Sequence, residues 1–366
     1  MTVTSVLTST GLCPPGPPVP GWLAVEDGRI VEVGRHAPPG GADDWGNAIL
    51  APAYLDLQVN GVDDVDFATA DGAAWDRAAR TLARHGVSGY LATLVSAPLD
   101  AYDAALRRLE AVIAGAEAGA AVTLGAHLEG PFLGDAPGAH PRELLRPVDL
   151  AWLDRLLDAH PDVIRMVTLA PEADPGGQAI AHLVDRGVLV ALGHSRVSDG
   201  EARAAASAGA RVVTHVFNGM GPLHHREPGL AGAALDDERL TPSLIADLVH
   251  VHPTVVRLVF AASRTVAIVS DAVAVGGDVQ AVDGAARLPD GRLAGATVLL
   301  DEAVANVVRI GVPIERVVAA ASTVPAALLG LVDRGRLVAG ARADVVALEP
   351  GTARLLAVWV GGERVA

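Results

Sequence analysis

Eight apolar segments of strand length alternate with Ala-rich segments of helical pattern through most of the chain. The apolar segments cover residues 52–59, 87–95, 121–130, 162–170, 187–195, 210–218, 242–251 and 264–272. Near-continuous apolar strands that alternate with amphipathic helices are typical of a parallel sheet covered by helices. Eight such units predict an α/β fold, a closed (β/α)8 barrel like that of the TIM barrels.

Both ends of the chain have a different pattern, in which short strand-like segments are separated by turns. Residues 21–34 are typical of two strands joined by a turn at Asp27-Gly28, and the C-terminal end contains two further apolar segments. Neither end is long enough to close a core alone. We therefore expect residues 1–51 and 335–366 to form one small β-sandwich domain beside a barrel of residues 52–334.

The composition excludes several kinds of chemistry. The chain has 28 basic and 43 acidic residues, a formal net charge of −15, and every basic residue is arginine. Without lysine, a P-loop, a Schiff base and a metal pair bridged by a carboxylated lysine are all excluded. The acidic balance argues against nucleic acid as a partner. Because no apolar run reaches the roughly 18 residues of a spanning helix and Cys13 is the one cysteine, we expect a cytoplasmic protein with no membrane partner.

Polar and ionisable residues stand at the carboxyl ends of six of the predicted strands. They are Gln58, Asn60, Glu129, His194, His215, His250 and Asp271. Catalytic groups of (β/α)8 barrels lie at this end of the strands. Randomly placed charges in an apolar barrel would each cost several kcal/mol if they lacked partners, and a metal ion is the economical partner.

One carboxylate and two imidazoles in this set are suited to a divalent metal. Glu129, His194 and His215 could hold Zn²⁺ or a similar ion and leave an open position for water. Such an ion lowers the pKa of its water and polarises a carbonyl group. Asp271 is placed to take the proton of the water and to return it to a leaving group. Because no nucleophile motif accompanies these residues, they predict metal-assisted hydrolysis.

Six motifs follow one another between residues 127 and 272. They are HLEGPFL (127–133), GAHP (138–141), LGHS (192–195), THVFNGMGPLHHREPG (214–229), ADLVHVHP (246–253) and VSDA (269–272). In this order they resemble the N-acetylglucosamine-6-phosphate deacetylase family of the amidohydrolase superfamily. The resemblance extends from about residue 52 to residue 348, nearly the whole chain.

The resemblance implies a hydrolase of linear amide bonds that converts N-acetyl-D-glucosamine 6-phosphate to glucosamine 6-phosphate and acetate in amino-sugar catabolism. It implies that Glu129, His194 and His215 hold one divalent ion per subunit, Zn²⁺ or Fe²⁺. It also implies that Asp271 is the general base and acid, and that His140 polarises the acetamido carbonyl group.

The resemblance further implies which residues contact the sugar phosphate. These are Ala139, His140, Asn218, Gly219, Arg226 and His250. Members of the family are usually homodimers in which the residues matching Arg226 and His250 reach the substrate of the neighbouring subunit. An arginine fork and an imidazolium suit a phosphate monoester, and neither requires lysine.

The chain departs from the family pattern at three places. The first strand carries Gln58 and Asn60 where many amidohydrolases carry His-x-His, and amides are poor ligands for transition metals, so we expect a mononuclear site. The loop that follows is Gly61-Val62-Asp63-Asp64 rather than glycine-rich, and the usual basic residue before Gly138 is missing. The sequence leaves open the metal, the preference between the glucosamine and galactosamine epimers, and a third interpretation, a non-catalytic scaffold of the same fold.

The remaining histidines have simpler interpretations. His127 lies on the same strand face as Glu129, two residues away, and we expect it to pack in the barrel rather than bind metal. His252 precedes a proline and is expected to begin a helix. His36, His160 and His182 stand in loops or at helix ends, where we expect them to be solvated.

Overall fold

The predicted barrel is present as one sheet of eight parallel strands. The computed structural model describes residues 5–13, 16–115, 118–282 and 284–366. The amide of Asp271 donates to the carbonyl of Gln58 at 2.9 Å, and these two residues join the last strand to the first. The strands lie in chain order around the barrel: β6 (Tyr54–Val59), β9 (Val87–Val95), β10 (Val122–Glu129), β11 (Ile164–Leu169), β12 (Leu189–Leu192), β13 (Val212–Val213), β14 (Thr241–Ile245) and β15 (Ala267–Val269).

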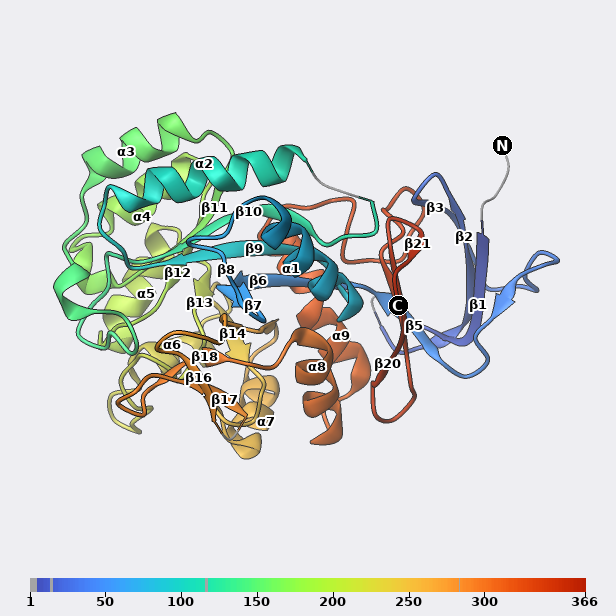
Figure 1. Ribbon diagram of the computed structural model, residues 1–366. Helices are drawn as coiled ribbons and strands as arrows, with labels where there is room; N and C mark the ends of the chain where they lie inside the picture. The colour runs from blue at the N-terminus through green and yellow to red at the C-terminus, as the bar shows by residue number, and fades with distance from the viewer. Residues whose placement is uncertain (1–4, 14–15, 116–117, 283) are drawn as a thin grey trace.

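Helices surround the barrel and bury one face each against it (Figure 1). Local capping marks where some of them begin. Ser198 and Glu201 form a reciprocal capping box at the start of the helix after β12, and Asp149 accepts the amide of Trp152 at the start of another. The helices are α1 (Gly72–Arg84), α2 (Ala101–Ala114), α3 (Leu150–Ala159), α4 (Gln178–Asp185), α5 (Asp199–Ala208), α6 (Gly229–Asp236), α7 (Pro253–Ala262), α8 (Leu300–Arg309), α9 (Ile314–Ala321) and α10 (Thr323–Leu328), with 3₁₀ turns η1 (Arg142–Leu144) and η2 (Pro171–Ala173).

The two ends of the chain form a small β domain, at the right of Figure 1. Its central pairing joins the ends directly, because Ala51 lies opposite Val346 in an antiparallel ladder. Leu23, Leu50 and Trp359 belong to its separate apolar core. The strands are β1 (Ser5–Leu12), β2 (Val19–Glu26), β3 (Arg29–Gly34), β4 (Asp43–Asp44), β5 (Ile49–Pro52), β19 (Val345–Leu348), β20 (Leu355–Val360) and β21 (Glu363–Arg364).

The boundaries of this domain, 1–51 and 335–366, stay a prediction, and residues 1–4 and 14–15 within it lie outside the described residues. The division has a physical basis in the two cores. The core of the β domain is distinct from the large core between the barrel and its helices, to which Trp75 and Leu106 belong.

A small antiparallel sheet beside the barrel was not predicted from the sequence. It consists of β16 (Gln280–Val282), β17 (Ala285–Arg287) and β18 (Leu293–Ala296), and a bridge between Ala296 and Ala272 fixes it to the segment that follows β15. A second short pair, β7 (Gly61–Val62) and β8 (Val65–Asp66), follows β6. Both lie after carboxyl ends of barrel strands, so they border the region where a barrel enzyme carries its chemistry.

The structure corrects one prediction about the histidines. His160 is 2% exposed rather than solvated, because its two ring nitrogens lie 2.8 Å from a carboxylate oxygen of Glu110 and 3.0 Å from one of Asp103. His252 begins α7, as expected, and its ring accepts the amide of Thr254. Within the described part of the chain, none of the helices is long and apolar enough to cross a membrane.

Candidate active site

Three buried side chains from three barrel strands meet at one point. Glu129 ends β10, and His194 and His215 follow β12 and β13. Nε2 of His194 and Nε2 of His215 lie 3.0 and 2.9 Å from Oε1 of Glu129, and 3.2 Å from each other. Among the residues that the structure describes, these form a group whose ligand atoms could share one metal ion.

The chemistry of these donor atoms fits a metal ion. Nδ1 of His194 lies 3.1 Å from the carbonyl oxygen of Ala136. Since a carbonyl oxygen only accepts, Nδ1 carries the proton and Nε2 presents a lone pair to the carboxylate oxygen of Glu129, which is also an acceptor. A cation between them resolves this conflict. Tetrahedral zinc at about 2.0–2.1 Å from each ligand would place donor atoms about 3.3 Å apart, near the distances observed.

The carboxylate of Glu129 and the two imidazoles shift one another's pKa values. Burial alone would raise the pKa of Glu129, but the neighbouring imidazoles of His194 and His215 outweigh it and hold the pKa well below its usual range. Burial opposes protonation of His215, yet its bond to Glu129 raises its pKa to about 9. A proton on His215 therefore compensates Glu129 where no cation does, and metal binding should release it.

Asp271 faces this group across two amide side chains. Nε2 of Gln58 donates both to Oε1 of Glu129 at 3.1 Å and to Oδ1 of Asp271 at 3.0 Å. Nδ2 of Asn60 donates to the same oxygen of Asp271 at 2.8 Å. Burial and the negative charge of Glu129 raise the pKa of Asp271 to about 6, which suits a group that must gain and lose a proton near neutral pH.

Three of these residues leave their strands in a left-handed backbone conformation. The φ angles are +52° at His194, +31° at His215 and +49° at Asp271. Such angles cost about 1–3 kcal/mol in a residue other than glycine and are concentrated at functional sites. All three side chains line the same pocket. Neighbouring groups hold the turns in place; for example, the amide of His215 donates to Oγ of Ser243 at 2.8 Å.

His140 lies beside the group in a fixed tautomer. Its Nε2 is 3.9 Å from Oε2 of Glu129, and its Nδ1 lies 2.9 Å from Oγ of Ser96 and 3.4 Å from the amide nitrogen of Ser96. An amide N–H only donates, so Nδ1 is the acceptor and Nε2 carries the proton. Burial, the largest cause, lowers the pKa of His140 to about 3. His140 is therefore a neutral hydrogen-bond donor at physiological pH.

His250 is hydrogen-bonded to a carboxylate, whereas His140 is hydrogen-bonded to a serine. Its Nδ1 lies 2.6 Å from Oδ2 of Asp247, so this nitrogen carries a proton and Nε2 is left for a ligand. Oδ1 of Asp247 accepts the amides of Val249 and His250 at 2.9 Å each. Burial would raise the pKa of Asp247, but these bonds lower it. The side chain of His250 is 4% exposed and lines the pocket of its own chain. Its contact with the substrate of a neighbouring subunit stays a prediction.

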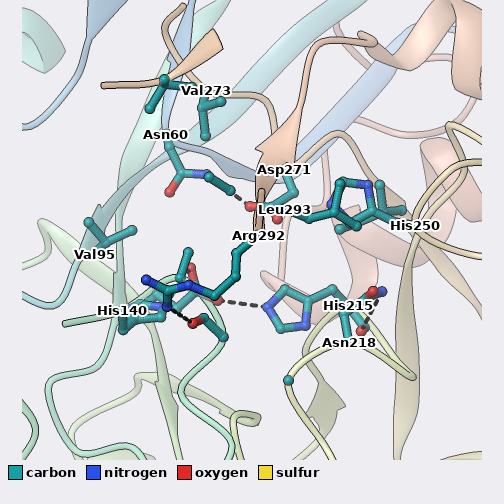
Figure 2. Close-up of a pocket in the computed structure, with 18 of the residues that line it drawn as sticks. Asn60, Val95, His140, His215, Asn218, His250, Asp271, Val273, Arg292 and Leu293 are labelled. Atoms are coloured by element: carbon teal, nitrogen blue, oxygen red, sulfur yellow. Dashed lines mark hydrogen bonds and ion pairs between the residues drawn. The ribbon is translucent and has the colours of Figure 1, made fainter. Parts of the chain in front are cut away.

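Nearly all of the residues predicted from the sequence line one pocket of about 480 Å³ (Figure 2). Gly219 lies so close to His194 that a Cβ there would be 2.7 Å from Nδ1 of the imidazole, and its φ is +56°, so both features require glycine. The predicted residues in the lining are Asn60, Glu129, Ala139, His140, His194, His215, Asn218, Gly219, His250 and Asp271.

Arg226 is the exception among the predicted catalytic, metal-binding and substrate-binding residues. It does not line this pocket, and its guanidinium lies on an exposed loop, 2.9 Å from Nε2 of His225. Three further residues beside the site, Ser96, Asp247 and Arg292, were not predicted from the sequence. Arg292 lines the pocket from the hairpin β17–β18. Asp247 stands three residues before His250, a spacing that could have indicated the pair.

Comparisons with known proteins agree with this geometry. The model of the amidohydrolase family matches residues 49–365. N-acetylgalactosamine-6-phosphate deacetylase of Escherichia coli O157:H7 is 39% identical, with 94% of this chain and 95% of the relative covered. N-acetylglucosamine-6-phosphate deacetylase of Bos taurus is 36% identical, with 94% of this chain and 88% of the relative covered.

Solved structures show the same fold at similar identity. A mutant of N-acetyl-D-glucosamine-6-phosphate deacetylase from Mycobacterium smegmatis, in complex with N-acetyl-D-glucosamine-6-phosphate, is 34% identical; the match has a TM-score of 0.92 and covers 99% of each chain. The enzyme of the same name from Thermotoga maritima gives 29% identity and a TM-score of 0.88, with 99% of each chain covered. The family model and these relatives cover nearly the whole chain, which therefore belongs to the amidohydrolase family.

Proposed function

We propose that the protein hydrolyses the acetamido group of N-acetyl-D-glucosamine 6-phosphate and releases glucosamine 6-phosphate and acetate, a step of amino-sugar catabolism. The observation that carries this proposal is the arrangement of three different groups around one pocket. One cavity is lined by the neutral donor His140, the carboxylate of Asp271 and the group of Glu129, His194 and His215 that could bind a metal ion. Amide hydrolysis needs one of each: a donor for the carbonyl oxygen, a proton carrier and a bound cation.

Glu129, His194 and His215 would hold one divalent ion per subunit, Zn²⁺ or Fe²⁺. When bound, the ion lowers the pKa of a water molecule and polarises the acetamido carbonyl group. The amide groups of Gln58 and Asn60 are engaged by carboxylates and offer no imidazole for a second metal, which supports a single ion. Metal analysis of the purified protein by mass spectrometry tests the number, and two tightly bound ions per chain would contradict it.

Each side chain around the pocket would have a separate role in the reaction. Nε2–H of His140 donates to the acetamido oxygen as negative charge develops there. Asp271 accepts a proton from the attacking water, whose oxygen forms a bond to the carbonyl carbon. The same proton then passes from Asp271 to the sugar nitrogen as the carbon–nitrogen bond breaks, which leaves acetate and the free amine. Gln58 and Asn60 hold the carboxylate of Asp271 in position throughout.

Deacetylation of N-acetylgalactosamine 6-phosphate is a second candidate. Its support is the 39% identity to the Escherichia coli enzyme of that name, against 36% to the Bos taurus enzyme named for the glucosamine epimer. The two sugars differ in the orientation of one hydroxyl group. The loop Gly61-Val62-Asp63-Asp64 departs from the family pattern and follows the first barrel strand, so it is the segment in which we would seek the preference.

The proposed assembly is a homodimer. Arg226 lies outside the pocket of its own chain, so a contact between this residue and the substrate requires a second subunit. Mixing Arg226→Ala with Asp271→Asn tests this, because a mixed dimer contains one pocket with both groups intact. Activity restored on mixing supports the dimer, and the absence of restoration contradicts a shared site. A cytoplasmic location stays a prediction from the sequence.

Acetate release from both epimers with added Zn²⁺ or Fe²⁺ is the decisive experiment. We expect turnover of N-acetylglucosamine 6-phosphate, with a kcat/KM for the galactosamine epimer that is lower. The reverse order would select the second candidate. Turnover of neither sugar by the metal-loaded protein would overturn both and would leave the non-catalytic scaffold.

A further inference from the structure

One carboxylate beside the site has no part in the proposed reaction. Glu172 lies in the 3₁₀ turn η2, directly after β11, and outside the active-site pocket. Its Oε2 accepts the hydroxyl of Ser195 at 2.5 Å, and its Oε1 accepts the amide of Arg196 at 3.1 Å. These two donors belong to the residues that follow His194 in the chain. The carboxylate therefore holds the turn by which the chain leaves a proposed metal ligand.

This turn needs fixed surroundings. The φ angle of +52° at His194 is one that a residue other than glycine keeps only where neighbouring groups enforce it. Ser195, which is fully buried, donates its amide to the carbonyl of Gly219 at 3.0 Å. Its Oγ accepts the amide of Val197 at 3.2 Å while it donates to Glu172. The hydroxyl of Ser195 thus has a fixed orientation, and Glu172 is its acceptor.

The segment that leads to His140 packs against the same carboxylate. A Cβ at Gly134 would overlap the side chain of Glu172, so glycine allows the backbone to lie directly on it. The amide of Gly134 donates to the carbonyl of His194 at 2.9 Å. Two residues further on, the carbonyl of Ala136 accepts Nδ1 of His194 at 3.1 Å. The backbone and the ring of His194 are therefore both held by a segment that rests on Glu172.

We propose that Glu172 is a positioning residue that fixes the imidazole of His194 for the metal ion. The inference rests on the proposed function, in which His194 is one of three ligands, and Glu172 acts on it through Ser195, Arg196 and Gly134. A carboxylate suits this role because its two oxygens both accept, and the amide of Arg196 and the hydroxyl of Ser195 are both donors. A glutamine would place an NH₂ group against one of them. Groups that orient a metal-binding histidine from outside the coordination sphere typically contribute 10- to 100-fold to metal affinity.

Binding of Zn²⁺ to the metal-free protein, measured against a chelating indicator dye, tests the proposal without any turnover. Glu172→Gln should weaken Zn²⁺ binding by about tenfold, the lower end of that range, because Glu172 acts through intermediate groups. The absorption spectrum of the Co²⁺-loaded protein should change as well, since it reports the geometry of the ligands. In the Zn²⁺-loaded protein, kcat should fall while KM for the sugar phosphate changes little.

Ser195→Ala tests the path from the carboxylate to His194. It removes the hydroxyl that Glu172 accepts and should also weaken Zn²⁺ binding. The double variant Glu172→Gln/Ser195→Ala should lose less affinity than the sum of the two single losses, because both substitutions break the same contact. Fully additive losses would contradict this path.

The matched control is Glu201→Gln. Glu201 also accepts a backbone amide and a serine hydroxyl, both from Ser198, at 2.9 and 2.7 Å, but it does so at the start of α5 and outside the pocket. A glutamine is tolerated in such a capping box, so the affinity for Zn²⁺ and the Co²⁺ spectrum should be unchanged.

Three outcomes would overturn the positioning role. They are wild-type Zn²⁺ affinity in Glu172→Gln, an unchanged Co²⁺ spectrum, and equal losses in Glu172→Gln and Glu201→Gln. If Glu172→Gln does not fold, Ser195→Ala must show the loss of affinity by itself, and wild-type affinity in that variant would overturn the role too. Wild-type protein that binds Zn²⁺ but releases no acetate would overturn only the proposed reaction.

Discussion

Replacement of Asp271 by Asn should separate the chemistry of the site from its stability. Oδ1 of Asp271 accepts Nε2 of Gln58 at 3.0 Å and Nδ2 of Asn60 at 2.8 Å. The amide oxygen of an Asn can accept the same two bonds, so the geometry should persist. The proton acceptor is lost, however, and general acid–base catalysis is worth about 10²–10⁴ in rate. We expect kcat to fall by that factor while KM changes little.

The same substitution should stabilise the metal-free protein above neutral pH. Burial and the charge of Glu129 raise the pKa of Asp271 from 3.8 to about 6. A raised pKa in the folded state means that ionisation costs folding free energy, about 3 kcal/mol for about two pH units. This cost is absent below pH 3.8, grows as the pH rises and is complete above about pH 6. The stability gain of Asp271→Asn should therefore approach about 3 kcal/mol near pH 8 and shrink towards pH 4.

Urea unfolding of chelator-treated protein between about pH 5 and pH 8 measures this difference, alongside acetate release by the metal-loaded protein. Asp174→Asn is the control. Its carboxylate is also buried, but it accepts the amides of Ala179 and Ile180 at 3.0 Å each and lies outside the pocket. That variant should lose stability and keep its activity. A stability difference for Asp271→Asn that does not vary with pH, or activity within tenfold of the wild type, would refute the reasoning.

Three further substitutions test individual contacts. Ser96→Ala should lower kcat by about three- to tenfold, because the tautomer of His140 loses one hydrogen bond, and Ser96→Thr should restore it; equal rates for all three proteins would contradict this role. Glu129→Gln should reduce bound metal to less than about one-tenth of the wild-type content, since the anionic ligand is lost, and an unchanged content by mass spectrometry would remove Glu129 from the ligand set. Asp247→Asn should raise KM for the phosphorylated sugar by about tenfold with less change in kcat, because the amide no longer fixes the proton on Nδ1 of His250; a selective loss of kcat would instead place His250 at the reacting atoms.

The barrel could be predicted because its strands are buried on both faces. Segments such as 87–95 and 121–130 are nearly continuous in apolar residues, and β9 and β10 lie within them. The strands themselves are shorter than predicted where a site residue follows. β13 contains two residues against a predicted segment of 210–218, because the left-handed turn at His215 ends the regular hydrogen bonding. The sequence shows how long an apolar segment is, but it does not show where a change of backbone conformation ends the strand.

The parts that were missed depend on contacts between distant segments. The hairpin β17–β18 has short strands and several glycines, so no periodicity marks it, and its position follows from the bridge between Ala296 and Ala272. Ser96 is one of many serines, and only the fold places it 2.9 Å from His140, 44 residues away. His160 was expected to be solvated because nothing near it in the sequence indicates the carboxylates of α2.

The candidate active site carries backbone strain that the rest of the barrel must offset. Positive φ angles at His194, His215 and Asp271 cost together about 3–9 kcal/mol, a cost comparable to the net stability of a whole domain. Only extensive burial elsewhere can offset it, and the continuous core between the barrel and its helices provides that burial. Glycine at these positions would relieve the backbone but remove the ligand or the proton carrier. The three strained positions therefore carry two of the proposed metal ligands and the proposed proton carrier, and this coincidence of strain and chemistry supports catalysis over a passive scaffold.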